Sequence, residues 1–436
     1  MVVISDLNAA DSLKAAVFDA HSRYSKKRPN SAALHEAASK VLPAGNTRTV
    51  LHYAPFPTAM RRGEDCRLWD IDGIEYLDLI GEYTAGLFGH SNPLIQAALR
   101  EALDRGVSLT AVGEAEAKFA SIICGRFPSI EKIRFTNSGT EANLMAITVA
   151  RVFTGRKKII AFKGGFHGSV LAFTSAGPTP ATAPFPFVLC NYNDIDGTIE
   201  AIRANEDDLA AVIIEPMLGA GGCIPASTEF LSALRKATAR ARALLIFDEV
   251  MTSRMSAGGQ QSRLGITPDL TSLGKYMAGG MSFGAFGGRT DIMNLFASQL
   301  AHAGTFNNNV LSMAGGCVAL GEVFSAPEAT ALFERGEALR DRLNAVCAAS
   351  GLPVQFTGLG SLLTVHFRTG HITQPYLGSD RENSLRELFF FDMLENGIYL
   401  ARRGMSALSL PVTAEHLSRF IRAVTEFLEA RRTLFA

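Results

Sequence analysis

The stretch LLIFDEVMTSRMSAGGQQSRLGITPDLTSLGKYMAGGMSFGAFGGR runs from Leu244 to Arg289. It opens with an apolar run that ends in the acid pair Asp248-Glu249, and it contains a single lysine, Lys275, among Gly, Ser and Leu. An apolar run without polar alternation is typical of a strand buried on both faces of a parallel sheet. A carboxylate at the end of such a strand is costly to bury unless it has a partner. The stretch therefore predicts an α/β sheet in which Asp248 and Lys275 bind a partner group or ligand.

Apolar runs of the same kind alternate with helix-like stretches in the middle of the chain. They are KIRFTN (132–137), KIIAFKGG (158–165), AAVIIEPM (210–217) and SFGAFGGR (282–289). This alternation is typical of α/β crossovers around a mostly parallel sheet. After about residue 325 the sequence indicates helix, then the strand SLLTVHF (361–367), then helix again. We expect a large domain over 81–325 and a smaller α+β domain built from both termini, residues 1–80 and 326–436.

The N-terminal region is predicted to be helical first and then to form a hairpin. Residues 10–40 mix Ala, Leu and charged side chains, as helices do. The segment RLWDIDGIEYLDLI (67–80) places Asp72-Gly73 between apolar residues. This pair favours a two-residue type I′ turn between two strands.

Composition excludes several classes of function. The 436 residues carry 42 basic and 42 acidic side chains, and a nucleic-acid-binding protein needs an excess of positive charge. Six cysteines without CxxC spacing indicate reduced thiols in a reducing compartment. The N-terminus lacks a signal-peptide pattern, and no apolar run reaches the length of a membrane span. We expect a cytoplasmic protein with no nucleic-acid or membrane partner and no metal site.

The loop FTNSGTEANLMAITVARVFTG (135–155) has the features of an anion site. A strand ends at Ser138-Gly139-Thr140, and a helix begins at once. Ser138 and Glu141 have the spacing of a capping box. The free N–H groups and positive end of a helix attract an anion, and two hydroxyls add donors. The alternative is a helix that is capped and binds nothing.

Two more loops complete a pattern that points to one cofactor. In KGGFHGSV (163–170), glycines flank Phe166, whose ring could stack on another flat ring or belong to the core beside a hydrogen-bonded His167. Asp248 would pair well with a protonated ring nitrogen, and a buried Lys275 with a lowered pKa would attack a carbonyl. Taken alone, Lys275 could be an ordinary surface lysine. Together, the anion cradle, the aromatic ring, the acid and the amine describe pyridoxal 5′-phosphate (PLP).

These motifs resemble those of the class III (ω-type) aminotransferases of fold type I over roughly residues 35–430. The resemblance is carried by FTNSGTEANLMA, GGFHG, IIEPM, IFDEVMTSR, DLTSLGKYMAGGMSFGAFGG and GTFNNN. Within the class the chain is similar to the glutamate-1-semialdehyde aminomutase-like branch. Through NTRTVLHYAPFP and EYTAGLFGH it is similar to the bacterial β-phenylalanine (aromatic β-amino acid) aminotransferases. The resemblance implies ping-pong transfer of an amino group from such a β-amino acid to a 2-oxo acid such as 2-oxoglutarate, giving a 3-oxo acid and glutamate.

The resemblance also assigns roles around the cofactor ring. It implies that Lys275 bonds to the cofactor and then moves the substrate proton, and that Asp248 keeps the ring nitrogen protonated. Phe166 is expected to stack on one ring face, and Val250 to pack against the other. The same resemblance places Glu215 near the cofactor without a defined role.

For the phosphate, the resemblance implies contacts with Ser138, Gly139 and Thr140. Thr305 in AGTFNNN is expected to reach the phosphate of a neighbouring subunit. This implies a homodimer whose two active sites are shared across an isologous interface.

Substrate recognition is expected to rest on two arginines. The resemblance places Arg48 and Arg403 in the active site, and a planar guanidinium suits a carboxylate. Arg48 would bind the carboxylate of the donor, and a mobile Arg403 would bind a carboxylate of a dicarboxylic acceptor. Four apolar or aromatic residues could line a pocket for a phenyl ring or belong to the core: Tyr53, Phe56, Tyr83 and Met405.

Three other functions stay open at this point. A glutamate-1-semialdehyde 2,1-aminomutase needs no external acceptor, but such enzymes usually carry an SPVRAF-like stretch where this chain has NTRTVLHY. Arg48 argues against a transaminase for amines that lack a carboxylate. A non-catalytic PLP-binding regulatory domain is usually fused to a DNA-binding segment, and this chain has no basic patch.

Overall fold

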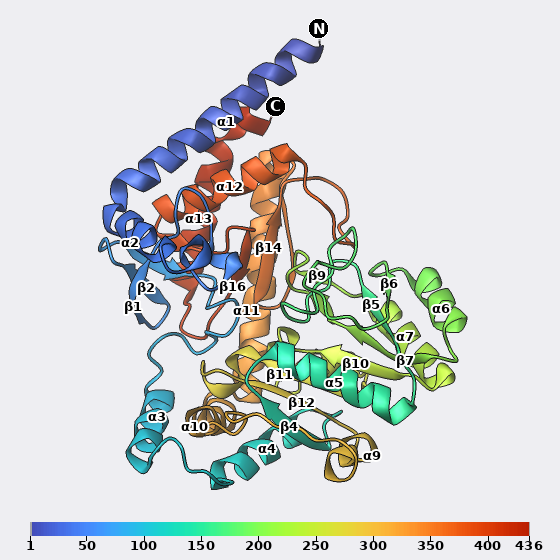
Figure 1. Cartoon of the computed structure of the whole chain (residues 1–436). Helices are drawn as coiled ribbons and strands as arrows, with labels where there is room; N and C mark the ends of the chain where they lie inside the picture. Colours follow the sequence, from blue (N-terminus) through green and yellow to red (C-terminus); the bar gives the residue numbers. More distant parts are fainter. Residues whose placement is uncertain (1, 436) are drawn as a thin grey trace.

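The computed structural model describes residues 2–435, and its central feature is a seven-stranded sheet (Figure 1). The strand order is β4-β12-β11-β10-β7-β5-β6. Neighbouring strands from β6 to β11 in this order pair in parallel. The strand β12 is antiparallel to both of its neighbours, β11 and β4. The bounds are β4 (Lys132–Thr136), β5 (Lys158–Phe162), β6 (Phe187–Cys190), β7 (Leu209–Ile214), β10 (Leu244–Asp248), β11 (Leu270–Gly274) and β12 (Gly284–Gly288). The predicted mostly parallel sheet is confirmed, with β6 and β11 as strands that the apolar pattern did not reveal.

Alternate residues of the central strands pack into two different cores, which is why these strands are apolar throughout. Ile213 and Ile246 pack with the helix α5 (Gly139–Thr154) on one face. Val212 and Leu245 pack on the other face with α7 (Thr228–Ala241), next to α6 (Ile195–Ala204). The sheet is thus a middle layer between helices.

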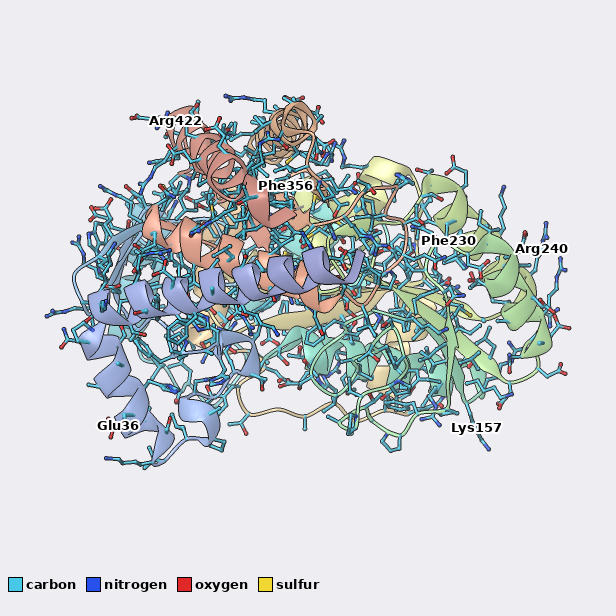
Figure 2. All side chains as sticks on the ribbon, turned by 90° about the horizontal axis from the view of Figure 1, so that it is seen from above. Glu36, Lys157, Phe230, Arg240, Phe356 and Arg422 are labelled. Carbon is cyan, nitrogen blue, oxygen red and sulfur yellow. The ribbon has the colours of Figure 1, made fainter. Side chains whose placement is uncertain are left out.

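Figure 2 shows the same division between interior and surface for labelled side chains. Phe230 on α7 and Phe356 lie inside, with 0% and 3% of their surface exposed. The charged side chains of Lys157, Arg240 and Arg422 lie at the outside of the molecule.

The two ends of the chain share a second region. A four-stranded sheet has the order β1-β2-β3-β15, and β15 (Ile398–Tyr399) pairs in parallel with β3 (Glu75–Asp78). The first helix, α1 (Val2–Lys27), packs on α12 (Asp380–Glu395), and Figure 1 shows blue and red helices side by side. A three-stranded sheet lies in the C-terminal part, with β13 (Gln355–Leu359), β14 (Leu362–His366) and β16 (Met405–Ala407).

The N-terminal hairpin forms as expected, but its turn differs from the predicted type. The strands β2 (Arg67–Asp70) and β3 pair antiparallel. Within the loop 71–74 only Gly73 has a positive φ, of 88°, whereas a type I′ turn needs two such residues. The loop is longer than two residues because the Asp70 carboxylate accepts hydrogen bonds from the N–H groups of Asp72 and Ile74 at 3.0 and 2.8 Å.

The remaining elements surround these sheets. Their bounds are α2 (Pro29–Ser39), β1 (Met60–Glu64), α3 (Pro93–Arg105), α4 (Glu114–Arg126), β8 (Met217–Leu218), β9 (Ile224–Pro225), α8 (Gly259–Leu264), α9 (Thr290–Met293), α10 (Val310–Val318), α11 (Ala326–Ser350) and α13 (Ala414–Ala430). Within residues 2–435, no single helix has the length and apolarity to span a membrane. The bent pair Val310–Val323 and Ala326–Ser350 meets that test only when its two parts are taken together, by length and composition alone.

Candidate active site

The predicted site residues come from loops that follow neighbouring strands of the seven-stranded sheet. Asp248 is the last residue of β10, and Lys275 follows β11 directly. Phe166, Glu215 and Ser138 come shortly after β5, β7 and β4. Because β5, β7, β10 and β11 are parallel, and β4 is antiparallel to β12 just as β11 is, these strand ends share one edge. That edge is where ligands bind in open α/β sheets.

Asp248 is buried, and three donors hold its carboxylate. Its Oδ2 atom lies 2.8 Å from His167 Nδ1 and accepts a hydrogen bond from Asn143 Nδ2 at 2.8 Å. Its Oδ1 atom accepts the N–H of Val250 at 3.0 Å. Burial alone would lower the pKa of His167, but the hydrogen bond and charge of Asp248 raise that pKa above its ordinary value of 6.5. The protonated imidazole thus offsets part of the cost of burying the carboxylate.

Lys275 lies in the same region with an amine that loses its proton easily. The pKa of Lys275 is lowered from 10.5 to about 8, first by burial and then by the charges of Arg403 and Arg48, whereas the charge of Asp248 acts in the opposite direction. The backbone φ of Lys275 is 60°, a conformation that non-glycine residues rarely adopt outside functional sites. The alternative of an ordinary surface lysine, open from the residue alone, is therefore wrong.

The second acid of the pair, Glu249, faces away from this arrangement. It is fully buried, and its carboxylate accepts hydrogen bonds from the N–H groups of Gln260 and Gln261 at 2.7 and 2.9 Å. It also accepts the hydroxyl of Thr252 at 3.1 Å. Glu249 therefore stabilises the loops after β10, whereas Asp248 lies at the strand edge with the other candidate site residues.

Ser138 caps the helix α5, as its position in the sequence predicts. Its Oγ atom accepts the N–H of Glu141 at 3.2 Å. The reciprocal half of the capping box is wrong, because Glu141 Oε2 accepts the N–H of Asn137 at 2.9 Å instead of that of Ser138.

Glycines allow the loops beside this helix end to close tightly. A Cβ atom on Gly139 would lie 2.8 Å from Cγ2 of Val250, and one on Gly168 would lie 2.1 Å from Oγ1 of Thr140. Both distances are shorter than real contacts of a Cβ atom allow. The N-terminus of α5, with the Ser138 and Thr140 hydroxyls, therefore forms a compact anion cradle.

Phe166 is positioned by the carboxylate of Glu215. The Phe166 side chain is 48% exposed, so the expectation of a core phenylalanine is wrong. Glu215 Oε1 accepts the N–H of Phe166 at 2.9 Å, and Oε2 accepts that of Gly219 at 3.0 Å. Burial raises the pKa of Glu215 to about 7, while the charge of His167 lowers it and that of Asp248 raises it. Glu215 thus joins two strand-end loops and leaves the Phe166 ring free on one side.

Arg48 reaches the site from the N-terminal segment. Its guanidinium forms an ion pair with Glu82 and lies 5.4 Å from the centre of the Tyr83 ring. The Tyr83 hydroxyl donates a hydrogen bond to the carbonyl of Val50 at 3.1 Å. Cation–aromatic contacts of this geometry hold a guanidinium in place.

Arg403 reaches the same tyrosine from the C-terminal part. Its guanidinium lies 5.6 Å from the centre of the Tyr83 ring and donates to Met405 Sδ at 3.2 Å. The buried Nε atom of Arg403 has no hydrogen-bond partner in the described part of the chain. Arg403 and Phe166 also line a cavity of about 460 Å³ that contains no acidic side chain. An unpaired guanidinium in such a cavity is suited to bind an anion.

Three of the four residues considered for a phenyl pocket belong to the core instead. Tyr53 and Phe56 are 3% and 8% exposed and pack against Tyr24. Met405 is fully buried. Tyr83 alone faces the site, because it lies in a turn rather than under the helices that cover Tyr53 and Phe56.

Thr305 lies in a loop that follows the seven-stranded sheet in the chain. It is exposed, in the segment between η5 (Asn294–Ala297) and α10. This segment is tied to the anion cradle through Asn137, whose Nδ2 donates to Asn307 Oδ1 at 3.1 Å.

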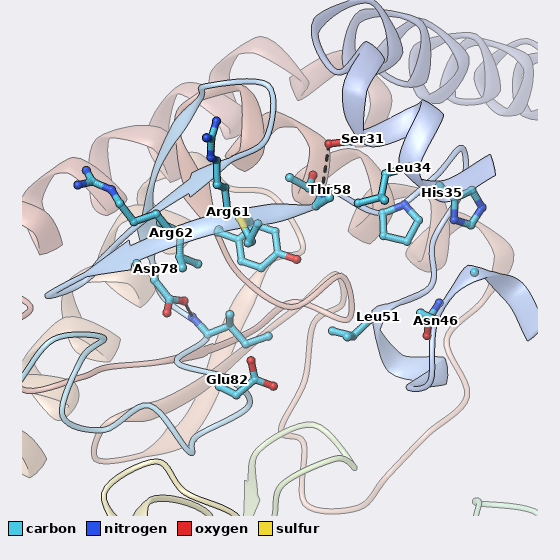
Figure 3. A pocket seen from close by; sticks show the side chains of 18 of the residues that line it. Ser31, Leu34, His35, Asn46, Leu51, Thr58, Arg61, Arg62, Asp78 and Glu82 are labelled. Carbon is cyan, nitrogen blue, oxygen red and sulfur yellow. Dashed lines mark hydrogen bonds between the residues drawn. The ribbon is translucent and has the colours of Figure 1, made fainter. Parts of the chain in front are cut away.

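A larger cavity, of about 650 Å³, borders the Tyr83 turn on the side of the N-terminal sheet. Figure 3 shows Asn46, Leu51 and Glu82 around this space, with Arg61 and Arg62 also at its border. The cavity lies next to Arg48, because Asn46 and Leu51 flank it in sequence and Glu82 is its ion-pair partner.

Sequence reasoning missed the roles of Asn143 and Glu82. The Asn143 amide bridges Asp248 and the carbonyl of His167, at 2.8 and 3.1 Å. The sequence did contain a signal for Asn143, because an Asn on the apolar face of a helix needs a polar partner. Glu82 gave no such signal, since its position depends on the backbone turn that carries it.

The residues at the strand edge fit PLP. The cofactor has a phosphate, a ring nitrogen that carries a proton, a flat ring and an aldehyde. The edge offers the α5 anion cradle for the phosphate, the buried Asp248 for the ring nitrogen, and the exposed ring of Phe166 for stacking. Lys275 supplies an amine whose lowered pKa favours its nucleophilic form.

Comparison with known proteins agrees with this geometry. The family model described as aminotransferase class-III matches residues 50–428. The β-phenylalanine transaminase of Variovorax paradoxus is 50% identical over 416 residues, which are 95% of this chain and 96% of that enzyme. A glutamate-1-semialdehyde 2,1-aminomutase of Rhodopirellula baltica is 36% identical over 392 residues, 85% of this chain and 89% of that one. The crystal structure of a β-phenylalanine aminotransferase from Variovorax paradoxus matches with a TM-score of 0.95 and 49% identity, over 97% of this chain and 99% of that chain.

Proposed function

The chain belongs to the class III aminotransferases, PLP-dependent enzymes of fold type I, and we propose that its amino donor is an aromatic β-amino acid resembling β-phenylalanine. The acceptor is a 2-oxo acid such as 2-oxoglutarate, and the products are a 3-oxo acid and glutamate. Two observations support this choice: the similarity to the β-phenylalanine transaminase of Variovorax paradoxus, and the two guanidinium groups beside Tyr83. The second observation carries the proposal, because Arg48 and Arg403 lie 5.4 and 5.6 Å from that ring.

Two arginines are needed because one site must accept two different molecules. The donor has one carboxylate and an apolar ring, whereas 2-oxoglutarate has two carboxylates. In this proposal Arg48 binds the donor carboxylate, with Tyr83 as part of the wall. Arg403 binds a carboxylate of the acceptor, in the cavity that has no acidic side chain. A bidentate guanidinium–carboxylate pair fixes orientation as well as affinity.

The chain's own residues would perform the proton transfer. When bound, PLP supplies an aldehyde carbon and an electron-withdrawing ring. Lys275 Nζ would then act as the base that removes the proton from the substrate carbon bearing nitrogen, and the same amine would return it to the carbon on the other side of that nitrogen. Asp248 holds a negative charge against the ring nitrogen, and His167 and Asn143 keep its carboxylate in place. The phosphate would lie in the cradle of Ser138, Gly139 and Thr140, and Phe166 and Val250 would confine the ring.

The proposal includes a homodimer with shared sites, in which Thr305 donates to the phosphate of the partner subunit. The exposed position of Thr305 fits this role better than one in its own site. Large apolar side chains are exposed beside it, at 63% for Phe306 and 87% for Val112. Exposed apolar side chains that lie together are typical of protein–protein interfaces.

The domain division of 1–80, 81–325 and 326–436 is also part of the proposal. The seven-stranded sheet lies within residues 132–288, and β15 completes a sheet begun by β1, β2 and β3. We place the protein in the cytoplasm because its six cysteines are free thiols.

A steady-state comparison of amino donors tests the proposed reaction. Racemic β-phenylalanine, α-alanine and 1-phenylethylamine would be offered with 2-oxoglutarate or pyruvate, and glutamate or alanine would be measured. We expect the highest kcat/KM for β-phenylalanine with 2-oxoglutarate. Turnover of 1-phenylethylamine that matches that of β-phenylalanine would contradict the carboxylate requirement. Conversion of glutamate-1-semialdehyde without an acceptor would instead identify an aminomutase.

A further inference from the structure

The guanidinium of Arg48 is already paired with a carboxylate of its own chain. Nη1 of Arg48 forms an ion pair with Oε1 of Glu82, and the two side chains are 42% and 59% exposed. We propose that Glu82 is an internal competitor for the substrate carboxylate, which occupies Arg48 in the free enzyme and is displaced when a substrate carboxylate binds. The inference rests on the proposed function, which assigns the donor carboxylate to Arg48.

The backbone around Glu82 fixes the point from which this side chain extends. Residues 81–84 have four consecutive positive φ angles, between 49° and 82°, which costs free energy for the three that are not glycine. The turn is fixed at its start by a hydrogen bond from the N–H of Gly81 to Asp78 Oδ1 at 2.9 Å. It is closed by one from the N–H of Gly86 to the carbonyl of Gly81 at 2.7 Å. A strained and well-bonded turn of this kind presents Glu82 at a defined position.

The same turn connects Glu82 with both substrate arginines. Tyr83 follows Glu82 directly, and its ring contacts the guanidinium groups of Arg48 and Arg403 at 5.4 and 5.6 Å. The charges of both arginines lower the pKa of Lys275, and that of Glu82 raises it. Glu82 is thus part of the electrostatic environment in which the substrate carboxylate and the amine must lie.

The structure leaves space for Glu82 to move away from Arg48. Glu82 borders the cavity of about 650 Å³, together with Asn46 and Tyr83, and Figure 3 shows its side chain at the edge of this space. Arg61 and Arg62 border the same cavity. Because the Glu82 side chain is 59% exposed, a rotation of this side chain is enough to take its carboxylate away from Arg48.

The expected effect follows from competition. Let K be the ratio of paired to unpaired Arg48 in the free enzyme. A ligand that must displace the pair then binds 1 + K times more weakly than it would bind an arginine without a partner. Exposed ion pairs correspond to a K on the order of 1 to 5. Removal of the Glu82 charge should therefore strengthen the binding of a carboxylate about two- to sixfold. An uncharged ligand of the same shape should not respond.

The test measures binding rather than turnover. The probe is 3-phenylpropionate, which has the carboxylate and ring of the donor but no amino group, and its Kd for the PLP-loaded enzyme is obtained by calorimetry. Glu82→Gln should lower this Kd about two- to sixfold, and Glu82→Asp should stay near the parent value. The Kd of 3-phenylpropanamide should be equal in parent and Glu82→Gln enzymes. Glu64→Gln is the matched control, because Glu64 is an exposed acid 3.6 Å from Arg62, and it should change neither Kd.

The outcomes separate this inference from the proposed function. If Arg48→Gln leaves the Kd of 3-phenylpropionate unchanged, then the donor carboxylate is not bound by Arg48, and the proposed function is wrong at that point. If Arg48→Gln weakens binding but Glu82→Gln does not strengthen it, only the competitor role of Glu82 is overturned. Equal strengthening of 3-phenylpropanamide would also overturn it, because the effect would then be one of shape and not of charge.

Discussion

Oδ2 of Asp248 lies 2.8 Å from Nδ1 of His167, and both side chains are buried at the edge of the central sheet. Two residues that are 81 positions apart thus form a charged pair with little access to water. Such a pair is stable only when its remaining hydrogen-bonding groups are also satisfied. Asn143 and the N–H of Val250 meet that need on the side of Asp248.

The first prediction concerns the protonation of His167. Its pKa lies above 6.5 although burial acts in the opposite direction, because the contact with Asp248 outweighs burial. The imidazole therefore stays protonated to a higher pH than an ordinary histidine. In Asp248→Asn the contact loses its charge, so the pKa of His167 should fall below 6.5. Nitrogen-15 NMR of labelled histidines measures this shift, with His366, whose burial lowers its pKa to about 4, as the control that should not move.

The second prediction concerns turnover in the same variant. Asp248→Asn preserves shape but removes the charge that stabilises the protonated ring nitrogen. We expect kcat to fall by roughly 10²-fold or more, with a smaller effect on the affinity for PLP. Both quantities can be measured on one preparation, by steady-state assay and by spectroscopic titration. A kcat near that of the parent enzyme would exclude this role for Asp248.

The third prediction concerns the reactivity of Lys275 before PLP binds. An amine attacks only in its unprotonated form, and burial lowers the pKa of Lys275 to about 8. Labelling of Lys275 in the apoenzyme by an amine-reactive ester should therefore rise with pH and reach half of its maximum near pH 8. Mass spectrometry of the digested protein gives the extent at each residue, and exposed Lys157 reports the reagent's own pH dependence. PLP followed by borohydride should protect Lys275 and attach the cofactor there; attachment at another lysine would contradict the assignment.

The fourth prediction concerns Thr305 and the dimer. If its hydroxyl donates to the partner's phosphate, Thr305→Ala should weaken PLP binding by about 1 kcal/mol or somewhat more, as for a hydrogen bond to a charged group. Affinity for PLP and dimerisation should also be linked, so that dilution of the protein releases cofactor. Sedimentation and fluorescence titration at matched concentrations measure both. The control is Thr425→Ala, which removes a hydroxyl that donates to the carbonyl of Ile421 within α13.

The fifth prediction separates the two arginines. Arg48→Ala should damage the half-reaction with an aromatic β-amino acid, and Arg403→Ala should damage that with 2-oxoglutarate while it spares the donor. Each loss should be on the order of 2–4 kcal/mol for a desolvated pair, and nearer 1 if water reaches it. Single-turnover experiments follow each half-reaction through the cofactor spectrum. Equal damage to both half-reactions by Arg403→Ala would refute this division.

Much of the candidate cofactor site at the edge of the seven-stranded sheet could be predicted, because it depends on local sequence. Asp248 ends an apolar strand, and Ser138 starts a helix directly after another strand, so both lie at the carboxyl edge of any parallel sheet. The apolar pattern did not reveal β11, because its sequence LTSLG has polar residues at buried positions. There Thr271 forms a hydrogen bond with Ser129 at 2.7 Å, a contact that depends on the folded chain.

The residues proposed to surround the substrate could be predicted only in part, because their positions depend on contacts between distant segments. Tyr53 and Tyr83 look alike in the sequence, but the first packs under α1 and α12 while the second lies in a turn of unusual backbone conformation. The pairing of Arg48 with Glu82 depends on that turn, which no sequence pattern specified. Long-range packing and backbone conformation therefore decided what local patterns left open.

The parallel pairing of β3 with β15 has a consequence for the synthesis of this protein. Leu77 and Asp78 pair with Ile398 and Tyr399, so a ribosome must add Tyr399 to the nascent chain before this sheet can be completed. During that time the nascent chain carries an open strand edge, which is prone to wrong pairing. The seven-stranded sheet needs nothing after residue 288 and can form earlier. Arg403 follows all strands of the seven-stranded sheet in the chain, so one wall of the substrate site is synthesised after that sheet.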